Sequence, residues 1–127
     1  MKWGLSMDKI MLNNMYFYGY HGLFPEENKL GQRFQVDLEL HANLKTAGQS
    51  DNMADSIDYG HVYKCVQHIV EGEKKNLIEA VAELIAASLL ENFAMLEACD
   101  VKVVKPDPPI PGYYESVAVQ IYRERDL

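Results

Sequence analysis

The sequence has few cysteines, few basic residues and no long apolar run, and each shortage excludes a class of protein. Its two cysteines, Cys65 and Cys99, lie far apart and form no CxxC pair, so we expect neither a disulfide framework nor a cysteine-rich metal centre. Both are expected to be reduced thiols, buried or half-buried. No apolar stretch approaches the roughly 20 residues of a membrane-spanning helix, and residues 1–6 lack the apolar segment of a signal peptide. We therefore expect a cytoplasmic protein without a membrane partner.

Positive charge is also scarce, because 12 lysines and arginines stand against 19 acidic residues and leave a formal net charge of −7. A protein that binds nucleic acid needs a basic patch that releases counterions. We therefore expect no nucleic-acid partner and instead a small ligand that is neutral or weakly charged. The four histidines form no HxH or HExxH motif, so neither a catalytic metal nor another cofactor is expected.

Length and periodicity predict one α+β domain. The 127 residues are expected to form a single domain with a core over residues 8–123 and an N-terminal extension over residues 1–6. Strict alternation of apolar and polar residues predicts a strand from Phe34 to Leu44. Further strands are expected at Lys9–Tyr18, Val101–Lys105 and Ser116–Arg123, with helices at Tyr59–Glu71 and after Asn76. The order β-β-α-α-β-β predicts a four-stranded antiparallel sheet with two helices on one face.

Long strands in so small a domain leave unpaired sheet edges. Natural proteins either blunt such edges or pair them with another subunit. We expect pairing, which predicts a ring or barrel of identical chains.

Four of the five prolines lie between Pro106 and Pro111, immediately after a predicted strand that ends at Lys105. Proline fixes its own φ and favours extended geometry in the residue before it, so Lys105 should still be in strand conformation where the chain turns. A lysine whose backbone is fixed and whose ammonium is partly desolvated can act as an acid or base. The alternative is an ordinary solvated lysine at a strand end.

Three other polar clusters lie at the ends of predicted elements, and each allows a structural or a functional interpretation. Glu79 follows Asn76 by three residues, which is typical of a capping box, but its carboxylate could equally accept from a ligand's N–H pair. Tyr59 could be a core or interface residue or a proton relay. Glu26 and Glu27 suit a solvated pair, and His21 could be a base or a turn residue without a catalytic role.

Together these clusters resemble the dihydroneopterin aldolase family of folate biosynthesis, over roughly Asp8 to Arg123. The matching pieces are Glu27 and the segments Tyr18–Gly22, Asp58–Gly60, Asn76–Glu79 and Lys105–Gly112. The resemblance implies a tunnelling fold, in which subunits join their sheets into a barrel-like oligomer and two tetrameric rings stack into an octamer. It also implies active sites between neighbouring subunits. Tyr113 departs from the family, since many relatives carry histidine there.

The activity that this resemblance implies is a lyase reaction without Schiff base or metal. Retro-aldol cleavage of 7,8-dihydroneopterin would yield 6-hydroxymethyl-7,8-dihydropterin and glycolaldehyde, with 2′-epimerase side activity, and the substrate's own C=N would accept the electrons. By resemblance, Lys105 would organise deprotonation of the 2′-hydroxyl through a water, Tyr59 would relay a proton, and Glu27 would orient the hydroxyls or the water. The pterin ring would be anchored by Glu79 and by the main chain at Ile57 and Ile78.

Two other functions stay open at this point. One is an epimerase of dihydroneopterin or its triphosphate, although a triphosphate would require a cluster of arginines and lysines that this sequence lacks. The other is a pterin- or purine-binding oligomer without catalysis, in which Lys105 is a surface lysine and Glu79 a helix cap.

Overall fold

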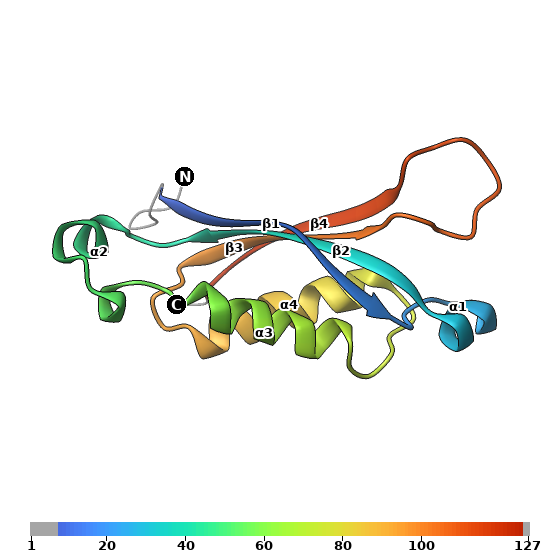
Figure 1. The fold of residues 1–127 in the computed structure, drawn as a ribbon, viewed down its shortest axis with the longest axis horizontal. Helices are drawn as coiled ribbons and strands as arrows, with labels where there is room; N and C mark the ends of the chain where they lie inside the picture. The colour runs from blue at the N-terminus through green and yellow to red at the C-terminus, as the bar shows by residue number, and fades with distance from the viewer. Residues whose placement is uncertain (1–7, 126–127) are drawn as a thin grey trace.

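The protein, seen here as a computed structural model that describes residues 8–125, is built on one antiparallel sheet with the strand order β1-β2-β3-β4 (Figure 1). The strands are β1 (Lys9–Gly19), β2 (Gln32–His41), β3 (Ala98–Lys105) and β4 (Val117–Glu124). The predicted four-stranded antiparallel sheet is therefore confirmed. The N-terminal extension expected at residues 1–6 lies outside the described residues.

Two helices, α3 (Tyr59–Val70) and α4 (Ile78–Asn92), cover one face of the sheet, as predicted (Figure 1). Alternation along β2 turns its apolar side chains toward these helices, and burial of each contributes about 1.5–3 kcal/mol. The core between the two layers is made by buried residues that include Phe34, Val36, Leu38, Leu40, Val81, Ile85 and Leu89. None of the helices within residues 8–125 has the length and apolar character needed to cross a membrane.

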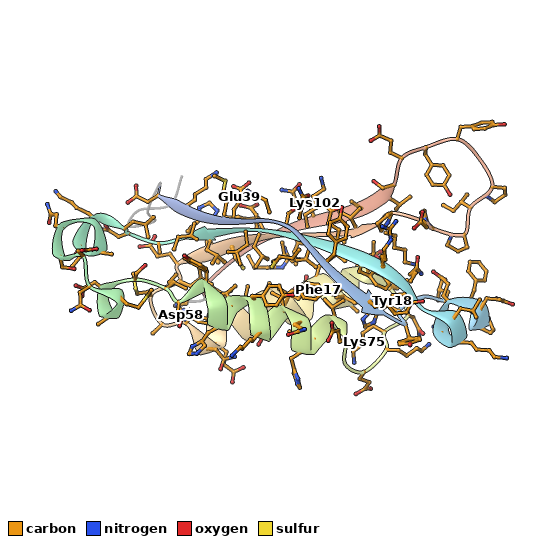
Figure 2. All side chains as sticks on the ribbon, viewed as in Figure 1. Phe17, Tyr18, Glu39, Asp58, Lys75 and Lys102 are labelled. Atoms are coloured by element: carbon orange, nitrogen blue, oxygen red, sulfur yellow. The ribbon has the colours of Figure 1, made fainter. Side chains whose placement is uncertain are left out.

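The opposite face of the sheet carries polar side chains. Figure 2 shows Glu39 and Lys102 on the side turned away from the helices, whereas Phe17 lies between sheet and helices. The outer strands β1 and β4 each pair with one neighbouring strand in the described chain, so both edges of the sheet are present as expected. Pairing of these edges with further chains stays a prediction.

Three short helical segments were not predicted: α1 (Pro25–Leu30), α2 (Lys45–Ser50) and the 3-10 helix η1 (Met53–Asp55). The expected extension of the second strand to Leu44 is wrong. Pairing of β2 with β3 ends where His41 faces Ala98, and Leu44 instead precedes α2. The apolar alternation therefore continues beyond the point where a partner strand can bond to it.

The helix starts agree with the sequence at one position and differ at another. Asp58 caps α3, since its Oδ1 accepts from the backbone N–H groups of Gly60 (2.9 Å) and His61 (3.4 Å). The predicted capping box of Asn76 and Glu79 is wrong, because α4 follows Leu77 and has no side-chain cap. The Asn76 Oδ1 instead accepts from Lys74 Nζ at 2.9 Å.

Candidate active site

A cavity of about 290 Å³ lies at the end of the sheet where β3 runs into the proline-rich loop. In Figure 1 that loop and α1 extend from the same end of the molecule. Leu23, Phe24 and Ile110 supply apolar walls. Four of the residues predicted from the sequence line the same cavity, namely Glu27, Ile78, Glu79 and Lys105.

An ion pair between Lys105 and Glu27 forms the polar side of this cavity. Lys105 is the last residue of β3, as predicted, and its Nζ donates to Glu27 Oε2 at 2.8 Å. The two side chains are only 13% and 7% exposed, so the alternative of a solvated lysine is wrong. The interpretation of Glu26 and Glu27 as a solvated pair holds only for Glu26, which is exposed.

Glu27 is held by donors from three directions. Oε2 also accepts from Gln32 Nε2 at 2.9 Å, and Oε1 accepts from the backbone N–H of Phe24 at 3.3 Å, three residues back at the start of α1. Burial alone would raise the pKa of the Glu27 carboxyl, but these hydrogen bonds and the charge of Lys105 hold it below its ordinary value. Glu27 is therefore an anion at neutral pH that fixes the position of the Lys105 amine.

Gln32 is a site residue that the sequence did not reveal. It opens β2, and only its contact with Glu27 connects it to the cavity. Its Oε1 is buried and has no hydrogen-bond partner among residues 8–125. Gln32 therefore serves Glu27 as a donor through its amide nitrogen.

Gly22 leaves the space in which the Glu27 carboxylate lies. Its φ is +152°, and a Cβ at this position would lie 2.4 Å from Glu27 Oε1. Any larger residue would displace the carboxylate. The Tyr18–Gly22 motif thus shapes the site through its backbone.

His21 of the same motif is a structural residue that fixes the loop beside the cavity. Its Nδ1 accepts from the backbone N–H of Lys75 at 2.9 Å, so the proton lies on Nε2, which donates to the carbonyl of Val70 at 2.7 Å. Burial lowers the pKa of this imidazole, against the opposing effect of the Val70 carbonyl. His21 is fully buried and does not line the cavity, which favours the interpretation without a catalytic role.

The burial of His21 predicts a loss of stability in mild acid. In the unfolded chain the exposed imidazole takes up a proton below about pH 6.5, whereas the folded chain resists protonation. At low pH the unfolded state therefore binds more protons than the folded state, so the free energy of unfolding decreases as the pH is lowered. Urea unfolding at about pH 7.5 and 5.5 should show a smaller fall for His21→Gln than for wild type, while the exposed control His61→Gln keeps the wild-type fall. An equal fall in all three proteins would contradict this assignment.

Glu79 faces the cavity as an exposed carboxylate near the start of α4. Within the described chain no hydrogen bond or ion pair is found for its side chain, which favours the ligand interpretation over the cap. The first backbone N–H groups of a helix also lack intrahelical partners. This corner of the cavity can therefore accept hydrogen bonds from a ligand and donate others to it.

Tyr59 and Ile57 do not line this cavity. Tyr59 is 61% exposed at the start of α3, whereas the other end of that helix, Val70, is bonded to His21 beside the cavity. A 12-residue helix is about 18 Å long, and Figure 2 shows Asp58 and Lys75 near its opposite ends. Ile57 is buried in the core. Within one chain, the predicted site residues thus lie in two separate places, one at the cavity beside Lys105 and the other at the start of α3.

Comparison with known proteins shows similarity over nearly the whole chain. Residues 10–122 match the profile of the family FolB, dihydroneopterin aldolase. A dihydroneopterin aldolase of Bacillus subtilis (strain 168) is 52% identical over 119 residues, which cover 94% of this chain and 99% of that protein.

Two solved structures share the fold. The Escherichia coli dihydroneopterin aldolase in complex with neopterin aligns with a TM-score of 0.84 and 28% identity, covering 92% of this chain and 99% of that one. The Burkholderia thailendensis dihydroneopterin aldolase bound to guanine aligns with a TM-score of 0.76 and 26% identity, covering 94% and 92%. The similarity therefore extends over sequence and fold alike.

Proposed function

Because this chain belongs to the dihydroneopterin aldolase family, we propose that the cavity beside Lys105 carries out retro-aldol cleavage of 7,8-dihydroneopterin. Family membership makes the protein an aldolase of folate biosynthesis. The observation that carries the assignment of the site is the Lys105–Glu27 pair, 2.8 Å long and almost shielded from solvent, in the same cavity as Glu79.

The pterin ring is bound through Glu79 in this proposal. Neopterin and guanine, the ligands of the two solved relatives, both present an amino group beside a ring N–H. A carboxylate accepts such a donor pair with two charge-assisted hydrogen bonds. Backbone groups near Ile78, and near Ile57 of a second chain, complete the pocket.

Bond cleavage depends on the pair at the other side of the cavity. Lys105, acting as the neutral amine that Glu27 holds in position, takes the proton of the 2′-hydroxyl through a bound water, and the C=O of glycolaldehyde forms as the C1′–C2′ bond breaks. The bonding electrons enter the C=N of the dihydropterin, so neither a Schiff base nor a metal is needed. Tyr59 delivers the proton that C1′ then requires, which leaves the 6-hydroxymethyl product. Return of glycolaldehyde in the opposite orientation before release gives the 2′-epimer as a side product.

Tyr59 reaches this cavity from a neighbouring chain. Its exposure and its distance from Lys105 within one chain support active sites at the contacts of a tetramer or octamer. The unpaired edges of β1 and β4 and the exposed apolar side chains along β1, such as Met11 and Tyr16, are surfaces that such an assembly would cover. Cys65 and Cys99 are both unpaired thiols, which supports work in the reducing cytoplasm.

Mixing two inactive variants tests the shared site. Lys105→Ala and Tyr59→Phe chains, unfolded together and refolded in equal amounts, should recover about a quarter of wild-type turnover, because random pairing gives one contact in four with both residues intact. Lys105→Ala mixed with Glu27→Gln is the matched control. It should recover nothing, since both changes lie in the same half-site. Absence of recovery in mixed oligomers verified by mass spectrometry would overturn the shared site.

The reaction itself is tested with 7,8-dihydroneopterin in the presence of EDTA. Glycolaldehyde should be released at the same rate with and without the chelator. Chromatography separates the cleaved pterin from the 2′-epimer and so distinguishes an aldolase from an epimerase. Thermal stabilisation by the pterin without any product would instead support the non-catalytic binding protein.

Replacing Gln32 with leucine should lower turnover about tenfold or more, because a hydrogen bond to a charged group is worth about 1.5–3 kcal/mol. Loss of this donor raises the pKa of Glu27, so the acid limb of the pH–rate profile should move to higher pH. Stability should change little, since leucine also removes the unsatisfied oxygen. Gln35→Leu, on the opposite face of the same strand, is the control. An unchanged acid limb in Gln32→Leu would refute its role.

A further inference from the structure

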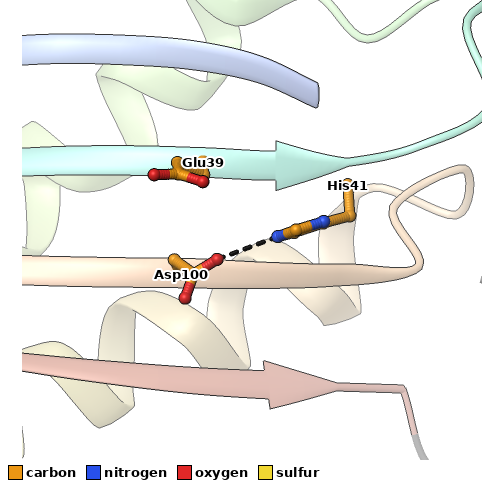
Figure 3. Close-up of side chains that lie close together, drawn as sticks. All are labelled: Glu39, His41 and Asp100. Carbon is orange, nitrogen blue, oxygen red and sulfur yellow. Dashed lines mark hydrogen bonds and ion pairs between the residues drawn. The ribbon is translucent and has the colours of Figure 1, made fainter. Parts of the chain in front are cut away.

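A second cluster of titratable side chains lies on the polar face of the sheet, formed by Glu39, His41 and Asp100 (Figure 3). Glu39 and Asp100 are directly opposite each other on β2 and β3, and His41 Nε2 lies 2.8 Å from Asp100 Oδ2. One ligand atom from each of the three residues lies within 4.8 Å of the others. The three side chains are half-buried.

This cluster is separate from the cavity beside Lys105. Gln32 at the start of β2 contacts Glu27, whereas His41 ends the same strand. A strand of 10 residues spans roughly 30 Å at about 3.3 Å per residue. Any role of the cluster is therefore independent of the retro-aldol chemistry.

Two carboxylates that face each other across a strand pair repel, and a cation between or beside them relieves that repulsion. In the structure Lys9 Nζ lies 2.7 Å from Glu39 Oε1, and the His41 ring lies beside Asp100. The Lys9 side chain is partly exposed at the start of the edge strand, and exposed ion pairs contribute little, with a median of about 0–1 kcal/mol. A cation bound by both carboxylates would neutralise the repulsion more fully.

The scaffold fixes the three side chains in place. β2 and β3 are the central strands, so both are hydrogen-bonded on each side. The His41 ring also packs edge-on against Tyr122, with centroids 5.7 Å apart and planes at 87°. Little ordering is left for a ligand to impose, which lowers the entropic cost of binding.

We propose that Glu39, His41 and Asp100 form a binding site for a divalent transition-metal cation of the zinc type. An imidazole nitrogen with two carboxylate oxygens suits Zn²⁺, Co²⁺ or Ni²⁺, whereas Mg²⁺ and Ca²⁺ favour oxygen ligands alone. On binding, the Nε2 proton moves to Nδ1, Nε2 coordinates the metal, and the cation replaces Lys9 as the partner of Glu39. The bound ion then cross-links β2 to β3. Its ligands come from two strands, so the sequence spacing could not show the site.

Isothermal titration calorimetry of the untagged, metal-free protein with Zn²⁺ tests the proposal. One ion per chain is expected, and His41→Gln and Asp100→Asn should each weaken binding at least about tenfold.

With Co²⁺ as the probe, a visible absorption band should appear in the wild type and be lost in His41→Gln. Zn²⁺ should raise the melting temperature of the wild type alone. Turnover should be unaffected in His41→Gln.

Two further variants separate this site from adventitious binding. Lys9→Gln removes the competitor for Glu39 and should bind Zn²⁺ several-fold more tightly. His61→Gln is the matched control, because His61 lies 3.8 Å from Asp58 without a third ligand residue found nearby in residues 8–125, and its affinity should equal that of the wild type. The proposal is overturned if His41→Gln binds Zn²⁺ as the wild type does, if His61→Gln loses binding equally, or if Mg²⁺ binds as tightly as Zn²⁺.

Discussion

Replacing Lys105 with alanine should lower the turnover of 7,8-dihydroneopterin by about 100- to 10,000-fold, the range that a positioned acid–base group contributes. Pterin affinity should change far less, because the proposed anchor of the ring is Glu79, which lines another part of the cavity. Steady-state kinetics together with a binding titration with neopterin measure the two effects separately.

The control for this substitution must separate chemistry from folding. Lys105→Ala leaves the Glu27 carboxylate buried without its cation, and breaking a buried pair destabilises proteins by about 3–5 kcal/mol. Lys105→Gln keeps a donor for Glu27 and should restore stability without restoring turnover. Recovery of turnover in Lys105→Gln would show that the lysine acts only as a structural partner.

Replacing Glu79 with alanine should have the opposite profile and weaken neopterin binding by about 100-fold or more, since two hydrogen bonds to a charged group are lost at about 1.5–3 kcal/mol each. Stability should be retained, because Glu79 is exposed and does not cap α4. Fluorescence titration measures the dissociation constant, and Glu91→Ala on the same helix is the control. A fall in melting temperature with unchanged affinity would restore the helix-cap interpretation. If Lys105→Ala and Glu79→Ala behave alike, the division between catalysis and binding is wrong.

The elements that the sequence predicted are those fixed by local periodicity. Alternation from Phe34 onward identified β2, and helical spacing identified α3 and α4, because these patterns place apolar side chains on one face wherever the chain goes. The local sequence pattern gave a wrong strand end where pairing with a distant strand determines that end. The end of β2 at His41 depends on where its antiparallel partner β3 begins, at Ala98, which no window of the sequence around β2 contains.

The same distinction explains the site. Lys105 could be singled out because the prolines act on their immediate neighbour. The position of Glu79 near a helix start suggested a cap, which is wrong, and only the family resemblance gave it a ligand role. The burial of Glu27 could not be predicted, since it depends on Lys105, 78 residues away, and on Gln32 at the start of β2. The separation of Tyr59 from the cavity was equally hidden, because the sequence placed Tyr59 at the start of a helix but did not show which end of that helix lies beside Lys105.

The pairing of Lys105 with Val117 has a consequence for how this enzyme can diverge. These two residues form the last pair of the β3–β4 ladder, so the loop of residues 106–116 begins and ends at one paired position of the sheet. Insertions or substitutions in that loop, including at the fully exposed Tyr113, can change what the cavity mouth touches without shifting the amine. Substrate preference can therefore evolve in one segment while the position of the Lys105 nitrogen, the proposed acid–base group, is inherited unchanged from the sheet.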